Sequence, residues 1–202
     1  MSNVGGSTAA PATRWRTVDI VVAAVLAVAF GVVFWAWGLL WNAVEPAFAF
    51  FPPARALLYG VWLIPAVLSS LIIRKAGAGL LTEALASTIS ALLGSTWGVT
   101  VVYQGLAQGA GGELPFLLTR YRRYGTAIAI ASGALAGFVA TMWDLFAWYS
   151  ESKLWDFQVP YVIAGTLSSA IIAGLGAVLL TRALASTGAL DRFPSGRTRE
   201  LI

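Results

Sequence analysis

The chain carries no charged residue from position 20 to position 44, and this run constrains the fold more than any other feature. An α-helix rises 1.5 Å per residue and the hydrocarbon core of a membrane is about 30 Å thick, so about 20 apolar residues are enough to cross it. A signal peptide has an apolar core of only about 7–15 residues. We therefore interpret residues 18–41 as a first spanning helix that is retained in the mature protein.

Composition extends this interpretation to the rest of the chain. Hydrophobic residues make up 58% of the 202 positions and charged residues 11%, against about 25% charged residues in soluble domains. The only charges between Lys75 and Arg120 are Glu83 and Glu113, and residues 94–98 (Gly-Ser-Thr-Trp-Gly) are typical of a turn. We predict an all-α membrane protein with six transmembrane helices, at residues 18–41, 55–73, 77–93, 97–119, 124–149 and 158–185.

The basic residues predict the orientation, because Lys and Arg concentrate in the cytoplasmic loops of membrane proteins. With the N-terminus inside, the inner segments hold Arg14, Arg16, Arg74, Lys75, Arg120, Arg122, Arg123, Arg182, Arg192, Arg197 and Arg199. The outer segments hold only Arg55 and Lys153. We expect both termini in the cytoplasm, with residues 1–13 as a disordered N-terminal tail, 14–188 as the six-helix transmembrane domain and 189–202 as a cytoplasmic C-terminal tail.

Several classes of chemistry are excluded by residues that the chain lacks. Cys and His are both absent, which removes disulfides, thiolate chemistry, His-ligated metals and His general bases. The chain also has no Gly-rich phosphate loop that ends in Gly-Lys-Ser or Gly-Lys-Thr. We therefore expect neither a catalytic site nor a metal site in this protein.

Aromatic residues gather on one side of the predicted bundle. Eight of the nine tryptophans lie in the outer half or the outer loops and only Trp15 lies inside, whereas interfacial belts place Trp and Tyr at both surfaces. These rings could anchor the outer interface or fill space between helices. Their number on one side favours an aromatic-walled cavity, which suits a planar ring or a cation.

Acidic and amide side chains at membrane depth add to this prediction. A carboxylate there is costly unless it is paired, and the predicted spans offer no Lys or Arg at the same depth. A cationic ligand could supply the partner; a protonated acid, a hydrogen bond between helices and a proton relay are the alternatives. The candidate binding residues are Trp37, Trp41, Tyr59, Glu83, Trp97, Tyr103, Gln104, Gln108, Glu113, Trp143, Asp144, Trp148 and Tyr161. The loop at 42–54, rich in Phe and Pro, is expected to cover the cavity.

The chain resembles the substrate-binding S components of energy-coupling factor (ECF) transporters, and most closely the YkoE family. The resemblance covers residues 14–188 and rests on the turn at 94–98, on residues 108–116 (Gln-Gly-Ala-Gly-Gly-Glu-Leu-Pro-Phe) and on residues 120–124 (Arg-Tyr-Arg-Arg-Tyr). Ala23 and Ala27, four residues apart on the first span, resemble the small-residue face on which S components dock their transmembrane coupling protein.

The resemblance implies a subunit that captures a vitamin from outside, namely thiamine or its hydroxymethylpyrimidine precursor. It also implies a transmembrane coupling (T) protein and two ABC-type ATPases as partners, with ATP hydrolysed by those partners and no cofactor in this chain. The expected location is the bacterial cytoplasmic (inner) membrane. Two other functions stay open: a stand-alone facilitator or ion-coupled carrier for an organic cation, and a membrane assembly protein without transport activity.

Overall fold

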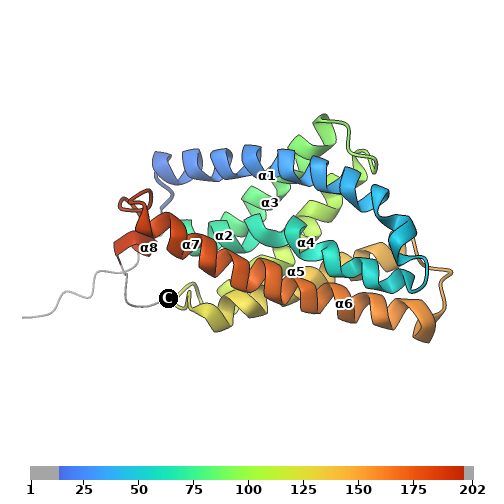
Figure 1. The fold of residues 1–202 in the computed structure, drawn as a ribbon. Coiled ribbons are helices and arrows are strands. Elements are labelled where there is room, and N and C mark those ends of the chain that lie inside the picture. The colour runs from blue at the N-terminus through green and yellow to red at the C-terminus, as the bar shows by residue number, and fades with distance from the viewer. Residues whose placement is uncertain (1–13, 198–202) are drawn as a thin grey trace, which may run out of the picture.

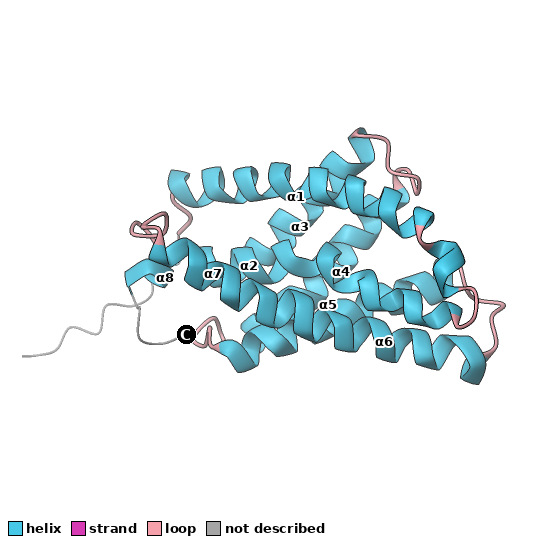
Figure 2. Cartoon of the chain, in the orientation of Figure 1, coloured by secondary structure: helices cyan, strands magenta, loops and turns pink. Residues whose placement is uncertain are grey.

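The computed structural model describes residues 14–197, which contain only helices and loops (Figures 1 and 2). The predicted tail at 1–13 and residues 198–202 lie outside the described residues. In chain order the elements are α1 (Thr17–Ala43), the short 3₁₀ helix η1 (Glu45–Phe48), the 3₁₀ helix η2 (Pro52–Leu63), α2 (Ile64–Ile73), α3 (Ala78–Leu92), α4 (Thr100–Leu118), α5 (Thr126–Ala147), the π-helical turn η3 (Leu154–Gln158), α6 (Val159–Ser169), the π-helical segment η4 (Ala170–Leu175), α7 (Gly176–Ser186) and α8 (Pro194–Arg197).

The six predicted spans correspond to helical bodies, because η2 continues into α2 and the elements from η3 to α7 form one rod. Four bodies are long and apolar enough to cross a membrane: Thr17–Ala43, Pro52–Ile73, Thr126–Ala147 and Leu154–Ser186. The helix α3 is a shorter apolar helix, and α4 carries two glutamines and a glutamate that lower its apolar character. Length and composition thus support four crossings, while the count of six stays a prediction.

The second helical body changes its winding half-way along its length. Its first half, on the predicted outer side, is the 3₁₀ helix η2, and its second half, on the predicted inner side, is the α-helix α2, with Pro65 in the first turn of α2. Proline suits a first helical turn because it lacks an N–H group that this turn would leave unpaired. At Pro65 the helical body therefore changes from 3₁₀ to α geometry.

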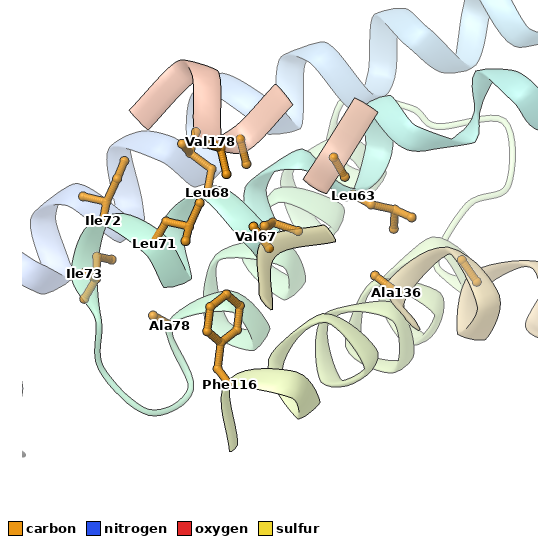
Figure 3. Close-up of a cluster of buried hydrophobic side chains, with 14 of the residues drawn as sticks. Leu63, Val67, Leu68, Leu71, Ile72, Ile73, Ala78, Phe116, Ala136 and Val178 are labelled. Atoms are coloured by element: carbon orange, nitrogen blue, oxygen red, sulfur yellow. The ribbon is translucent and has the colours of Figure 1, made fainter. Parts of the chain in front are cut away.

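The inner half of this body is the centre of the bundle. All of α2 after Ile64 is buried, and Figure 3 shows Leu63, Val67 and Leu71 in the same cluster as Phe116 of α4 and Val178 of α7. Such contacts stabilise through packing, because lipid tails are as apolar as the side chains themselves. The apolar core therefore fills the inner half of the molecule and leaves the outer half for polar and aromatic groups.

Small residues allow the surrounding helices to approach closely. A Cβ atom added at Gly133 of α5 would lie 2.7 Å from the backbone nitrogen of Gly174 in η4 and would also meet the carbonyl oxygen of Ser169. At Gly31 of α1 it would lie 2.5 Å from Cγ2 of Ile89 in α3. Gly133 and Gly137 therefore form a packing surface between α5 and the last rod.

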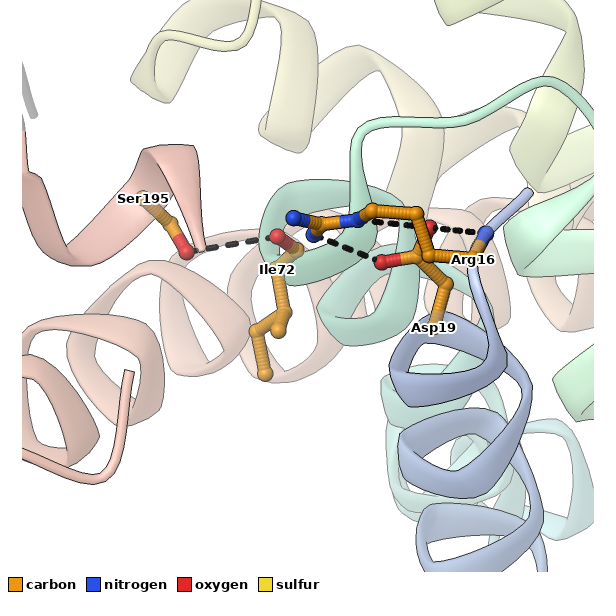
Figure 4. Close-up of polar contacts among 4 residues, drawn as sticks. All are labelled: Arg16, Asp19, Ile72 and Ser195. Carbon is orange, nitrogen blue, oxygen red and sulfur yellow. Dashed lines mark hydrogen bonds and ion pairs between the residues drawn. The ribbon is translucent and has the colours of Figure 1, made fainter. Parts of the chain in front are cut away.

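The start of α1 and the segment around α8 meet at one end of the bundle (Figure 1). Ser195 donates a hydrogen bond of 3.2 Å to the carbonyl oxygen of Ile72 at the end of α2, and nearby Arg16 forms an ion pair of 2.9 Å with Asp19 (Figure 4). Leu190 and Phe193 are buried. Although the segment from 189 was expected to be a tail, its described part packs against the bundle.

Candidate ligand-binding cavity

A cavity of about 220 Å³ lies at the end of the bundle opposite α8. It is enclosed by the last turns of α1, by η2, by the facing sides of α3 and α4, and by the end of α5. Its lining residues are Phe34, Trp41, Asn42, Arg55, Tyr59, Trp62, Ser87, Ser90, Ser95, Trp97, Val101, Gln104, Gln108, Asp144, Trp148 and Tyr149. Seven of these residues are aromatic and eight others carry polar side chains, a combination that can both stack on and hydrogen-bond a small molecule.

Asp144 is the acidic centre of this cavity. Its Oδ2 accepts hydrogen bonds from the hydroxyls of Tyr59 (2.7 Å) and Tyr161 (2.6 Å), and its Oδ1 accepts one from Nε2 of Gln104 (2.9 Å). Each carboxylate oxygen offers about two lone-pair positions. Oδ2 is therefore saturated, whereas Oδ1 keeps one acceptor position for a ligand N–H group.

Four aromatic rings form a connected wall around this acid. Trp41 and Tyr59 meet edge-on with centroids 5.9 Å apart, and Trp62 lies 5.2 Å from Trp41 and 5.7 Å from Trp97. The indole N–H of Trp62 donates to the carbonyl oxygen of Phe34 (3.3 Å), which fixes the ring plane. These edge-to-face and tilted contacts fix the orientation of the rings, and indole rings of this kind attract a flat or cationic ligand.

Glu83 lies behind the cavity and caps a helix. Its Oε1 accepts a hydrogen bond of 2.6 Å from Nε2 of Gln108, which lines the cavity floor. Its Oε2 accepts the backbone N–H of Ala66 (3.1 Å), an unpaired donor of the first turn of α2. A carboxylate at a helix N-terminus is favourable for the helix dipole as well. Glu83 therefore does not line the cavity and reaches it only through Gln108, so a direct ligand-binding role for Glu83 stays a prediction.

Glu113 also accepts backbone N–H groups at the start of a helix, and it does not line the cavity. Its carboxylate accepts the backbone N–H groups of Gly77 (2.7 Å), Gly79 (2.8 Å) and Leu80 (3.3 Å) at the start of α3. Burial and the neighbouring Glu113 carboxylate raise the pKa of Tyr121 to about 12. The structure therefore removes Glu113 from the predicted binding residues, since it joins α4 to the start of α3.

The cavity thus brings together some of the predicted residues and not others. Those that line it are Trp41, Tyr59, Trp97, Gln104, Gln108, Asp144 and Trp148. Tyr161 lies behind Asp144, and Trp37 bonds the carbonyl oxygen of Leu58 (2.9 Å) outside the lining. Tyr103 is 58% exposed and Trp143 does not line the cavity. Each of the last two precedes a cavity residue by one position, which on a helix turns the side chain about 100° away.

Several lining residues were not among the candidates predicted from the sequence, and Arg55 is the most consequential of them. Its guanidinium lies 4.3 Å from the ring centroid of Trp41, and its Nη1 is 2.7 Å from Oε2 of Glu45. The prediction that no cation lies at the depth of the acids is therefore wrong for this cavity. The signal was present in the sequence, because Arg55 is one of only two basic residues in the predicted outer segments.

The predicted docking residues of the first span are also corrected. Ala23 and Ala27 are each 1% exposed and face the interior of the bundle. The opposite side of α1 is exposed and apolar, with Val21, Val25 and Val28 on it. Ala23 and Ala27 therefore serve the packing of α1 inside the subunit, and only the valine side of the helix is open to lipid or to another protein.

Known proteins share the sequence and the fold of this chain. The family described as "ABC-type cobalt transport system, permease component" matches residues 18–139. YkoE of Bacillus subtilis (strain 168), named as an HMP/thiamine permease protein, is 33% identical over 187 residues, which cover 91% of each chain. The chain belongs to the YkoE family. The crystal structure of an S component of an ECF transporter matches with a TM-score of 0.86 and 30% identity, covering 91% of this chain and 92% of that chain.

YkoE-family membership and the shared fold agree with the predicted ECF S-component bundle, which is confirmed. The chain is a multi-pass protein of the bacterial cytoplasmic membrane and a subunit of the vitamin-transporter S-component class. It is a transport protein and not an enzyme.

Proposed function

We propose that this S component captures thiamine or its hydroxymethylpyrimidine precursor from outside and passes it to a transporter complex. The complex would contain a transmembrane T protein and two ABC-type ATPases, which hydrolyse ATP. The name of the B. subtilis relative supports the ligand class. The S-component fold of the matching crystal structure supports the complex.

The observation that carries this proposal is the open acceptor position on Asp144 beside the aromatic wall. An aminopyrimidine is flat and carries N–H donors, so it can stack on an indole while one N–H bonds Oδ1 of Asp144. Thiamine adds a thiazolium cation, which is attracted both to the carboxylate and to indole faces. The two ligands share the pyrimidine, and the proposal places that ring against Asp144.

The test is the affinity of the purified chain for thiamine and for hydroxymethylpyrimidine by titration calorimetry. Asp144→Asn keeps the size of the side chain but replaces an acceptor oxygen with a donor group, so affinity for both ligands should fall by about 10- to 100-fold. Asp156→Asn, at an exposed outer position, is the matched control and should bind as wild type. A wild-type chain that binds neither ligand would contradict the proposal.

A further inference from the structure

A second cavity adjoins the first at its outer mouth. It has a volume of about 470 Å³ and lies between the loop after α1, the start of η2 and the π-helical turn η3. Asn42, Arg55 and Tyr149 line both cavities. A ligand seated in the aromatic cavity therefore has a second space beside it, and Arg55 stands at the junction.

Arg55 is held firmly at this junction. Its side chain is only 13% exposed, its guanidinium lies over Trp41 at 4.3 Å, and it lines both cavities together with Tyr149. Stacking on an aromatic face is a geometry that guanidinium adopts readily and that leaves the N–H groups at its edge free to bond. The cation is thus part of the cavity wall.

The anion that pairs with Arg55 is held much less firmly. The Glu45 side chain is 69% exposed and contacts Arg55 through one oxygen, 2.7 Å from Nη1. An ion pair with one exposed member contributes little to stability, because water solvates the carboxylate almost as well. The two members of the pair therefore differ in how firmly they are held. Arg55 is a fixed part of the cavity wall, whereas the exposed Glu45 carboxylate can be replaced by another anion.

We propose that Arg55 is an anion subsite, filled by the Glu45 carboxylate in this structure, that takes the phosphate of a phosphorylated ligand. Resting on the proposed function, this places the pyrimidine against Asp144 and the phosphate in the outer cavity. Guanidinium has five N–H donors in a planar fork that matches two phosphate oxygens at once. A phosphate monoester carries nearly two negative charges at pH 7.5, so it outcompetes a single exposed carboxylate.

The experiment compares thiamine with thiamine monophosphate in dodecyl maltoside at pH 7.5, and reads the ratio of the two dissociation constants. Glu45→Gln removes the competing anion, so the monophosphate should gain about tenfold in affinity relative to thiamine. Arg55→Gln should cost the monophosphate about tenfold or more relative to thiamine. Lys153→Gln removes an exposed outer cation and should leave the ratio unchanged.

Thiamine binding is the internal control for folding, because a variant that still binds thiamine has an intact aromatic cavity. Equal losses of both ligands in Arg55→Gln, with no change of the ratio in Glu45→Gln, would overturn the proposal and leave Arg55 as a structural tie. Failure of the wild type to bind thiamine at all would instead reject the proposed function.

A phospholipid headgroup is the other source of a phosphate at this depth, and the same ratios measured in phosphatidylcholine nanodiscs separate the two. If the ligand phosphate fills the subsite, the effects of both variants persist in nanodiscs. If they are seen only in the phosphate-free detergent, lipid headgroups occupy Arg55 and the assignment to the ligand is wrong.

Discussion

At the scale of single residues, acidic side chains of one chemical type perform different tasks in this protein. Asp144 is held by three side-chain donors and keeps an acceptor position toward the cavity. Glu83 and Glu113 instead accept backbone N–H groups at the starts of α2 and α3. The difference arises from depth along the bundle: only Asp144 lies where the aromatic wall leaves space.

A substitution at Trp97 tests whether the aromatic wall binds the ligand. Trp97→Ala removes a ring that lines the cavity and supports Trp62 edge-on, so thiamine binding should weaken by about 1–2 kcal/mol. The measurement is quenching of intrinsic fluorescence during a thiamine titration. Trp155→Ala, at an exposed position in η3, is the control and should change nothing. Wild-type affinity in Trp97→Ala would mean that the ligand lies elsewhere.

A substitution at Glu113 tests whether this residue stabilises the start of α3 without taking part in ligand binding. Glu113→Gln replaces an oxygen that accepts backbone N–H groups with a donor, so it should lower the free energy of unfolding by about 1–3 kcal/mol. Thermal unfolding in detergent should show a lower Tm than for Glu151→Gln, an exposed loop change. Thiamine affinity should stay near the wild-type value, and a large loss of affinity without a change in Tm would contradict the capping role.

At the scale of elements, close packing depends on where glycine stands along a helix rather than on how much glycine the helix contains. Gly133 faces the backbone of the last rod, whereas Gly176, at the start of α7, has no atom within 4 Å of the position a Cβ would take. The same residue type is therefore indispensable for packing at one site and replaceable at the other.

This difference predicts opposite outcomes for one substitution. Gly133→Ala would force α5 away from η4, because the atoms it meets are backbone atoms that cannot rotate aside, so Tm should fall by several degrees. Gly176→Ala should leave Tm unchanged or raise it, since alanine favours a helix over glycine by about 1 kcal/mol. Equal effects of the two changes would show that α5 and the last rod do not pack as described.

At the scale of the whole molecule, the cavity opens at one end of a bundle whose opposite end is tightly packed. The apolar cluster around α2, the Glu113 contacts and the buried segment before α8 all fill the inner half. A ligand that enters the aromatic cavity therefore has no path to the opposite end of the bundle in this conformation. Passage across the membrane requires a rearrangement of this packed end.

Transport should consequently depend on partners. The purified chain in liposomes should bind thiamine without accumulating it, and uptake should appear when a T protein and the two ATPases are added with ATP. An ATPase variant that cannot hydrolyse ATP is the control: thiamine should still bind, but no uptake should be seen. Accumulation by the chain alone would favour the stand-alone carrier that the sequence left open.

The sequence by itself determined the class of fold and where the helices run. Uncharged runs, Gly-rich turns and loop charges report directly on burial in lipid, because a helix in a membrane must be apolar along its length. These signals located six helical bodies, as well as Asp144, Gln104, Gln108 and the outer tryptophans as candidates. These signals depend only on residues close together in the sequence, so they can be read without knowing which helices are neighbours.

Only the tertiary structure decided what each candidate does. Whether Glu113 binds a ligand or caps α3 depends on which backbone N–H groups face it, and these come from another helix. Ala23 and Ala27 form an apolar pair on any helix, and their burial became visible only once α3 lay beside α1. Arg55 was placed in an outer segment by sequence, but it belongs to the first turns of η2, where it lies over Trp41 and lines the cavity. Contacts between helices distant in sequence have no local pattern, and those contacts separate a binding residue from a structural one.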